Sequence, residues 1–347
     1  MSERQTSNAD TKNSHFSEIT ISDYRILKGL TVNNLSKINL IAGANNTGKT
    51  SFLEAIGLLI GQNDVNNVVK IYNKRGKFFN KIPNKWLQNE LQNIIINVNG
   101  IFKNFNVEVK IRGYQEEEES FNKASYLFSL EFSLKTLRIG NSRFFSNKAP
   151  GAYFKKFYRL CNYHLFSQNI ISEVEKSLAF KSAVKNDLHE QIIEFIRQHI
   201  DKDIKAIMYF ESDQQFIVKP STLDIKSYGE GLQKIYFLAL QFAYAKDGVL
   251  LIDELENGIH VDLLSKFIAL IFKLSEEFNV QVFFTTHSKE CIETFVKVAE
   301  NEGKLSEVSS YALLNTNNKI EVDYISGEEL SQLIESHGFD LRRVGKL

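Results

Sequence analysis

Residues 40–56, LIAGANNTGKTSFLEAI, decide the fold of this chain. The apolar run 38–41 predicts a strand, a loop bounded by two glycines follows it, and a helix-forming run begins after the loop. This is the G-x-x-x-x-G-K-[ST] pattern of a phosphate-binding loop, in the strand–loop–helix setting that the pattern requires. The predicted nucleotide-binding residues are Gly43, Ala44, Asn45, Asn46, Thr47, Gly48, Lys49, Thr50 and Ser51.

Each part of this loop has a role in holding a nucleoside triphosphate such as ATP. Gly43 and Gly48 let the loop curl so that backbone N–H groups point at phosphate oxygens, and the positive end of the next helix adds to the attraction. Lys49 would bridge the phosphates as a point charge, and the Thr50 hydroxyl would bind Mg²⁺. A glycine turn that matches by chance is the alternative, but the flanking strand and helix favour the phosphate site.

Length and composition describe an ordinary globular protein. At 347 residues we expect one large domain with insertions or two lobes. The formal net charge is zero, so there is no global electrostatic case for binding nucleic acid or a membrane. Cys161 and Cys291 lack metal-ligand spacing, which indicates a reducing compartment. With a polar N-terminus and no apolar run near the roughly 18 residues of a membrane span, the sequence predicts a cytoplasmic protein.

The pattern divides the chain into four regions. Residues 1–14 are polar and predicted to be disordered. Residues 15–150 form an N-terminal ATPase lobe, in which alternating runs predict antiparallel strands around the phosphate loop. In residues 151–205, apolar side chains recur at three- and four-residue spacing and predict a helical insertion. Residues 206–347 form a C-terminal ATPase lobe.

Residues 227–231, SYGEG, precede a strongly apolar helix-forming run. A serine–glycine turn at a helix N-terminus presents a hydroxyl, backbone N–H groups and the helix dipole to an anion. A simple helix cap is the alternative for this segment taken alone. The candidate residues are Ser227, Gly229, Glu230 and Gly231.

Two further apolar runs end in polar residues. Residues 248–254, GVLLIDE, predict a buried parallel strand that delivers its acids to the C-terminal edge of the sheet, where ligands bind. Asp253 would hold Mg²⁺, directly or through water, and Glu254 would orient and polarise the attacking water. The run 280–286 is followed directly by His287, which could contact the γ-phosphate from the same edge. An isolated histidine is usually structural, but its place beside these acids favours a catalytic role.

The order of the four motifs, GANNTGKTS, SYGEG, LLIDELENGIH and FFTTHS, resembles that of ABC-type ATPase heads. Within that group the chain is similar to the RecF/SMC/OLD-like branch. The segment ITISDYRILKGL, before the phosphate loop, also resembles the opening strands of that branch. The similarity covers nearly the whole chain and is greatest to stand-alone OLD-like ATPase subunits of the AAA15/AAA21 type, as in the PARIS and Septu anti-phage defence systems. It implies an α/β head with a mixed or parallel core sheet, an antiparallel β subdomain and a helical insertion.

The same resemblance implies that ATP is sandwiched between two protomers. The SYGEG residues would face nucleotide held by the partner's phosphate loop, so that triphosphate stabilises the dimer and hydrolysis loosens it. The loop that crosses between the two sites would contain Asn257, Gly258 and His260.

The chain departs from transporter-type heads at two places. Residues 230–232 differ from the Gly-Gly-Gln of the transporter signature, and Leu255 stands where transporters carry proline. Both departures favour the OLD-like branch. The glutamine that senses Mg²⁺ and water in many such heads has no assigned position, and Gln88 and Gln92 are the candidates.

Together these features predict a Mg²⁺-dependent ATPase. The resemblance implies that it assembles as a dimer or higher homo-oligomer and governs a separately encoded nuclease or toxin. The alternative is a DNA-binding ATPase of DNA repair or chromosome maintenance, although the chain has zero net charge and no SMC-length heptad segment. A transporter subunit is disfavoured by the SYGEG signature. The residues after His287 leave no room for a TOPRIM-type nuclease, and Glu328 and Glu329 are expected to begin the last helix.

Overall fold

The computed structural model describes residues 15–76, 89–91, 93–114, 126–134, 137–145, 148–152, 159–166, 173–210, 213–218, 222–225, 228–317 and 319–343. Several sequence predictions fall outside these residues. They concern the polar segment 1–14, Gln88, Gln92 and Ser227.

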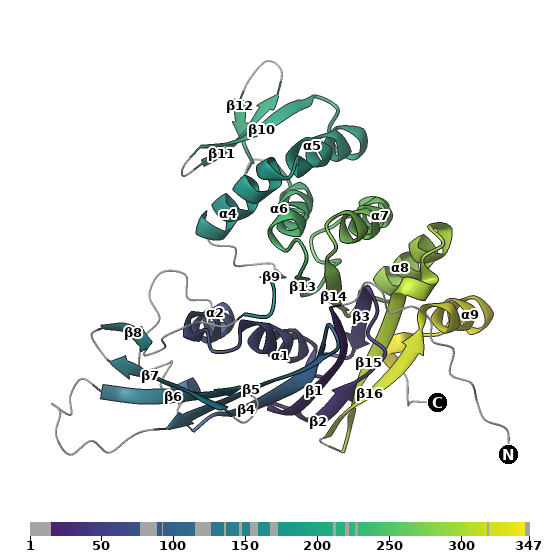
Figure 1. Cartoon of the computed structure of the whole chain (residues 1–347). Coiled ribbons are helices and arrows are strands. Elements are labelled where there is room, and N and C mark those ends of the chain that lie inside the picture. Colours follow the sequence, from purple (N-terminus) through teal and green to yellow (C-terminus); the bar gives the residue numbers. More distant parts are fainter. Residues whose placement is uncertain are drawn as a thin grey trace.

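Six strands form the core sheet: β3 (Ile38–Gly43), β9 (Tyr163–Phe166), β13 (Val249–Ile252), β14 (Gln281–Thr286), β15 (Val308–Thr316) and β16 (Lys319–Ser326). Their order is β16-β15-β3-β14-β13-β9, and all run parallel except β16 at one edge (Figure 1). β3, β13 and β14 are buried throughout, which explains their nearly continuous apolar sequences. The carboxyl ends of the parallel strands therefore share one edge.

A second, antiparallel sheet contains β1 (Phe16–Tyr24), β2 (Leu27–Val32), β4 (Ile95–Phe102), β5 (Phe105–Tyr114), β6 (Tyr126–Leu134), β7 (Leu137–Phe145) and β8 (Lys148–Ala152). Its order is β2-β1-β4-β5-β6-β7-β8. In β4 every second residue is buried, as expected for a sheet with one face against a core. The antiparallel strands predicted on both sides of the phosphate loop are thus confirmed.

The helix that follows the phosphate loop, α1 (Lys49–Gly61), lies between the two sheets (Figure 1). Every residue of α1 except Thr50 is buried, as expected for a helix that is covered on both sides by packed structure. Phe52 and Ile56 belong to one apolar cluster with Ile21 of the antiparallel sheet and Phe283 of the core sheet. α2 (Val65–Gly76) continues this middle layer. The position of α1 is therefore fixed from both sides.

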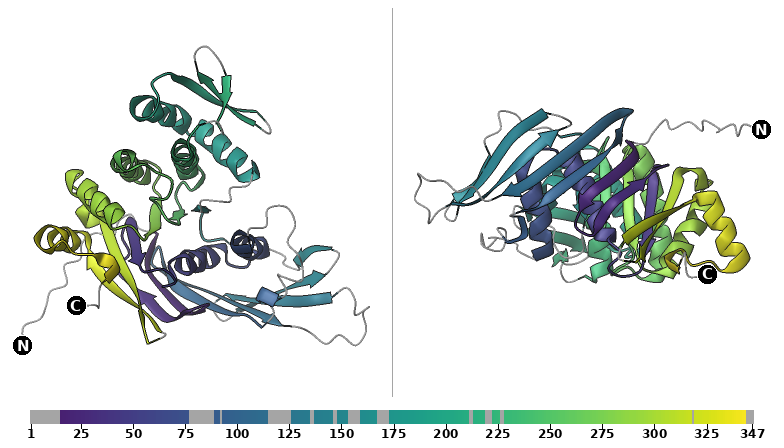
Figure 2. Two further views of the ribbon diagram at one scale, coloured as in Figure 1. Left: turned by 180° about the vertical axis from the view of Figure 1, so that it is seen from behind. Right: turned by 90° about the horizontal axis from the view of Figure 1, so that it is seen from below.

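Helices cover the other face of the core sheet, as the left view in Figure 2 shows. They are α6 (Glu230–Tyr244), α7 (Val261–Glu277), α8 (Lys289–Asn301) and α9 (Gly327–His337), with short 3-10 turns η2 (Leu305–Glu307) and η3 (Leu341–Arg343). Ser326 caps α9 by accepting from the Glu329 N–H at 3.2 Å, which confirms that Glu328 and Glu329 begin this helix.

The predicted helical insertion, residues 151–205, contains α4 (Glu173–Lys185) and α5 (Leu188–His199), which pack on α6. The structure differs from the prediction because β9, also in this range, is an edge strand of the core sheet. Its four residues carry no decisive pattern, and only pairing with the distant β13 makes them a strand.

The next segment also differs from the prediction that residues 206–347 belong to the C-terminal ATPase lobe. Three strands, β10 (Ile204–Phe210), β11 (Asp213–Val218) and β12 (Thr222–Asp224), form a separate antiparallel sheet, and β10 packs on α5. The chain returns to the core only at α6. The segment between β9 and α6 therefore contains β-structure as well as helices, because β10 pairs with β11 in one hairpin.

Within the described residues, no helix combines the length and apolar character that crossing a membrane demands. Cys161 and Cys291 are both free cysteines.

The burial of α1 predicts that its apolar residues carry much of the stability. Ile56 is fully buried, so Ile56→Ala should lower the free energy of unfolding by about 2–5 kcal/mol. Val184→Ala in α4 is the control, because that side chain is half-exposed and its loss should change stability by no more than about 0.5 kcal/mol. Denaturant unfolding measures both, and equal small losses would contradict the packing of α1 between the sheets.

Candidate functional site

The phosphate loop joins β3 to α1, and two glycines determine its shape. A side chain at Gly43 would place a Cβ 2.6 Å from the Leu313 carbonyl oxygen, so only glycine fits there. Gly48 has φ +92°, in the left-handed region that favours glycine. Across the loop, Thr47 Oγ1 donates to the Ala44 carbonyl oxygen at 2.9 Å. The two glycines of the motif thus meet separate steric demands.

Lys49 is buried inside the curve of this loop. Its Nζ donates to the carbonyl oxygens of Gly43 at 2.9 Å and Ala44 at 2.8 Å. Burial lowers the pKa of Lys49, and the negative charges of Asp253 and Glu254 act against that shift. The ammonium therefore lies between the loop and the two acids that follow β13. A phosphate bound in the loop would contact the ammonium there.

A three-residue contact joins α1 to two strand ends. Thr50 Oγ1 donates to Asp253 Oδ2 at 2.9 Å, and Thr285 Oγ1 donates to Asp253 Oδ1 at 2.7 Å. Burial raises the pKa of Asp253, whereas the two hydroxyl donors lower it. A carboxylate next to a hydroxyl fits Mg²⁺, which proteins usually bind through one or two such oxygens, with phosphates and water completing the coordination. Sequence reasoning missed Thr285 because only His287 was singled out in that segment.

Glu254 is held in a strained backbone conformation. Its φ is +52°, which is uncommon for a residue with a side chain. Its N–H donates to Thr285 Oγ1 at 2.8 Å, and its carbonyl oxygen accepts from Lys234 Nζ at 2.8 Å. The carboxylate lies 3.7 Å from His287 Nδ1 and accepts from Asn257 Nδ2 at 3.3 Å. The carboxylate is thus positioned from several sides while remaining partly exposed.

His287 follows β14 and contacts a residue that the sequence did not single out. Its Nδ1 is 3.3 Å from Glu256 Oε1, and its backbone N–H donates to the same oxygen at 3.1 Å. Its carbonyl oxygen accepts from Arg342 Nη1 at 2.8 Å, and Asp340 holds the Arg342 guanidinium through two hydrogen bonds. No pattern in the sequence links Arg342 to His287, because the contact depends on how the C-terminal segment folds back.

Lys234 is the most informative residue that sequence reasoning missed. It lies in the apolar helix α6, and its buried ammonium donates to the carbonyl oxygens of Glu254, Leu255 and Asn257, each at 2.8 Å. Burial lowers the pKa of Lys234 to about 8. Its three N–H donors are matched by three backbone acceptors, so this lysine ties α6 to the turn that carries Glu254. A single lysine within an apolar helical run was the only available signal.

The N-terminal end of α6 also lies against the loop after β13. A Cβ at Gly231 would be 2.9 Å from the Gly258 carbonyl oxygen, which is a close backbone approach. His260 caps α7 by accepting from the Asp262 N–H at 3.4 Å. The exposed residues of this surface are Gly229, Glu230, Asn257, Gly258 and His260.

The structure brings together predicted residues from β3, β13 and β14 and their following loops at one edge of the core sheet. In the phosphate loop Ala44, Asn45 and Asn46 are exposed, and Ser51 is buried in the first turn of α1. The residues that meet at this edge are Lys49, Thr50, Asp253, Glu254 and His287.

This fold and this site define an ATPase domain of the AAA type. The chain belongs to the family described as "AAA domain, putative AbiEii toxin, Type IV TA system", whose model matches residues 38–293.

Known proteins resemble the chain along most of its length. An "ATP/GTP phosphatase" of Helicobacter pylori is 24% identical over 364 residues, covering 92% of this chain and 97% of that protein. The fold is similar to an SMC head solved with the C-winged helix domain of ScpA (TM-score 0.52, 13% identity, 90% of this chain and 98% of that one). An SMC head with an extended coiled coil from Pyrococcus furiosus, bound to the C-terminal domain of ScpA, also has TM-score 0.52 (12% identity, 94% and 100%). These two likenesses confirm the predicted α/β head.

The contacts of Lys234 predict that this residue affects turnover through the Glu254 turn, without touching the nucleotide itself. Lys234→Met removes three hydrogen bonds that hold the Glu254 turn, so kcat for ATP should fall about 10- to 100-fold while KM changes little. The matched control is Lys273→Met, an exposed lysine on α7. Steady-state kinetics measures both variants, and an unchanged kcat in folded Lys234→Met would contradict this role.

Proposed function

We propose that this chain is a Mg²⁺-dependent ATPase whose protomers assemble around ATP and govern a separately encoded effector. The observation that carries the proposal is the contact of Asp253 with the hydroxyls of Thr50 and Thr285, which places the start of α1, the acids of β13 and the end of β14 in one site. The nucleotide phosphatase name of the Helicobacter pylori relative supports hydrolysis.

The residues of the site suit attack of water on the γ-phosphate. Lys49 and the loop N–H groups would hold the phosphates, and Thr50 and Asp253 would hold Mg²⁺, which neutralises charge on the phosphate oxygens. Glu254 would orient the water and accept its proton while the bond to ADP breaks, so that ADP and phosphate leave. His287, held through Glu256, would donate toward the γ-phosphate.

Residue Gln168 is a better candidate than Gln88 or Gln92 for the glutamine that senses Mg²⁺ and water. Phe166, the last residue of β9, accepts at its carbonyl from the Asp253 N–H at 2.9 Å. Gln168 follows Phe166 by two positions in the sequence and itself lies outside the described residues. The contact of Phe166, two residues earlier in the sequence, with the acid proposed to bind Mg²⁺ supports this assignment.

The exposed surface beside α6 supports an ATP sandwich between two protomers. Gly229 and Glu230 at the start of α6 and Asn257 after β13 are exposed and lie on one surface, joined by the contact of Gly231 with Gly258. A helix N-terminus attracts phosphate, and this one would meet nucleotide held by the partner's loop.

The effector is proposed from family membership and resemblance. The family description names a putative AbiEii toxin and a type IV toxin–antitoxin system. The motifs resemble those of PARIS and Septu ATPases, which act beside a separate effector in anti-phage defence. We infer that this chain likewise uses ATP-dependent assembly to hold or release a nuclease or toxin.

Replacement of the proposed base tests the chemistry. Glu254→Gln keeps the size of the side chain but removes its basicity, so ATP should still bind while turnover falls at least about 100-fold. Calorimetry measures binding and phosphate release measures turnover. Wild-type turnover in this variant would show that Glu254 is not the base.

The sandwich predicts complementation between two inactive variants. Lys49→Ala removes the phosphate contact of its own protomer, and Ser227→Arg should block the site of the partner. An equal mixture should regain up to about a quarter of wild-type turnover, because half of the dimers are mixed and each has one intact site. Full activity of Ser227→Arg alone, or no recovery on mixing, would contradict assembly in trans.

The effector is tested by purifying tagged Glu254→Gln protein from its native host with ATP present, followed by mass spectrometry. The matched control is Lys49→Ala, which should not assemble around ATP. A stoichiometric nuclease or toxin recovered only with Glu254→Gln supports the proposal. Recovery of DNA and repair factors instead would favour the DNA-binding alternative.

A further inference from the structure

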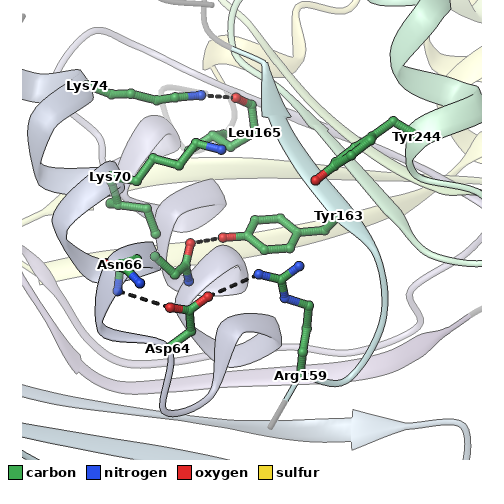
Figure 3. Close-up of a pocket in the computed structure, with 10 residues that line it drawn as sticks. Asp64, Asn66, Lys70, Lys74, Arg159, Tyr163, Leu165 and Tyr244 are labelled. Atoms are coloured by element: carbon green, nitrogen blue, oxygen red, sulfur yellow. Dashed lines mark hydrogen bonds and ion pairs between the residues drawn. The ribbon is translucent and has the colours of Figure 1, made fainter. Parts of the chain in front are cut away.

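A pocket of about 180 Å³ lies between α2 and β9 (Figure 3). Asn67, Lys70 and Lys74 line it from α2, and Tyr163 lines it from β9. Arg159, just before β9, completes this side. Figure 3 shows Lys74 bonded to Leu165 at one end of the pocket and Arg159 bonded to Asp64 at the other.

The pocket and its rim hold more positive than negative charge. Three cationic side chains line it, Lys70, Lys74 and Arg159, against one lining carboxylate, Asp64. Arg159 Nη2 is paired with Asp64 Oδ2 at 3.0 Å, and Lys70 is paired with Glu175 of α4. Glu175 also acts on Lys74, so three cations face two carboxylates and the group carries one positive charge in excess.

Lys74 is the side chain for which an anion would matter most. Its ammonium donates to the Leu165 carbonyl oxygen, which is a neutral acceptor. Burial lowers the pKa of Lys74 to about 8, against the effect of Glu175. A buried ammonium is costly unless an anion is near, and an anion in the pocket would favour its charged form.

The pocket reaches the edge of the sheet that carries the site for hydrolysis. Leu165 directly precedes Phe166, whose carbonyl oxygen accepts from the Asp253 N–H at 2.9 Å. The pocket also touches the added helices, because Lys70 pairs with Glu175 of α4. An anion bound there would compete with Glu175 for Lys70 and so influence how α4 is held to the core.

We propose that this pocket binds a small oxyanion of the phosphate class through Lys70, Lys74 and Arg159. Lysine and arginine donors are the usual partners of phosphate oxygens. The Tyr163 hydroxyl, which lines the same space, already donates to the Asn67 amide oxygen, so the cations are the groups that would hold the anion. The volume is below the roughly 300 Å³ at which pockets for drug-sized ligands begin, so a free phosphate fits better than a whole nucleotide. The proposal rests on the proposed function in one respect, that hydrolysis at the neighbouring site supplies phosphate.

The test measures binding of inorganic phosphate to full-length protein carrying Lys49→Ala, because the phosphate loop would itself bind phosphate. Calorimetry should detect one site per chain in Lys49→Ala. Adding Lys74→Met should weaken binding at least about tenfold, since a charge-assisted hydrogen bond is lost. Adding Arg159→Gln, at a half-exposed position where misfolding is less of a concern, should also weaken it.

The control adds Lys181→Met, an exposed lysine on α4, and should bind phosphate like Lys49→Ala. Absence of phosphate binding to Lys49→Ala at millimolar phosphate, or equal binding in all three added variants, overturns the proposal. If AMP does not compete with phosphate for the pocket, the ligand is free phosphate. If AMP displaces phosphate, the pocket is supported and its ligand is the phosphate group of a nucleotide. Because Lys49→Ala should not turn over ATP, this outcome is independent of whether wild-type protein hydrolyses ATP.

Discussion

The contact between the Thr50 hydroxyl and the Asp253 carboxylate connects residues 203 positions apart in the chain. It exists because α1 is packed between two sheets, so that its first turn cannot move away from the end of β13. Thr285 adds a second hydroxyl from β14 to the same carboxylate. Through these bonds the phosphate loop, the acids and the histidine segment share one edge, and every step proposed for hydrolysis depends on that arrangement.

The turn after β13 couples this site to the surface where a second protomer would bind. Glu254 has a positive φ, and its backbone is held by Thr285 on one side and Lys234 on the other. Lys234 belongs to α6, whose exposed start is the proposed contact with the partner's nucleotide. A shift of α6 on assembly would therefore act directly on the carboxylate that orients water, which gives a physical route from dimer formation to hydrolysis.

The α2–β9 pocket adds a second link, between the edge of the core sheet and the inserted helices. Lys70 pairs with Glu175 of α4, and positive charge from Lys74 and Lys70 lowers the pKa of Glu175 to about 2 although burial alone would raise it. The carboxylate therefore remains ionised and holds α4 to the core. In a protein that reports its nucleotide state to a partner, such a charged contact is a suitable place for regulation.

The sequence by itself determined the phosphate loop, the two strands that end before Asp253 and His287, the antiparallel strands and the final helix. Each of these depends on local pattern, namely glycine spacing, apolar runs and alternation. Only the tertiary structure decided the strand β9, the pairing of β10, β11 and β12 into a separate sheet beside α5, and the contacts of Lys234, Glu256, Thr285 and Arg342. These features depend on partners distant in sequence. A lysine in an apolar helix or a four-residue run acquires its meaning only from the groups that folding places beside it.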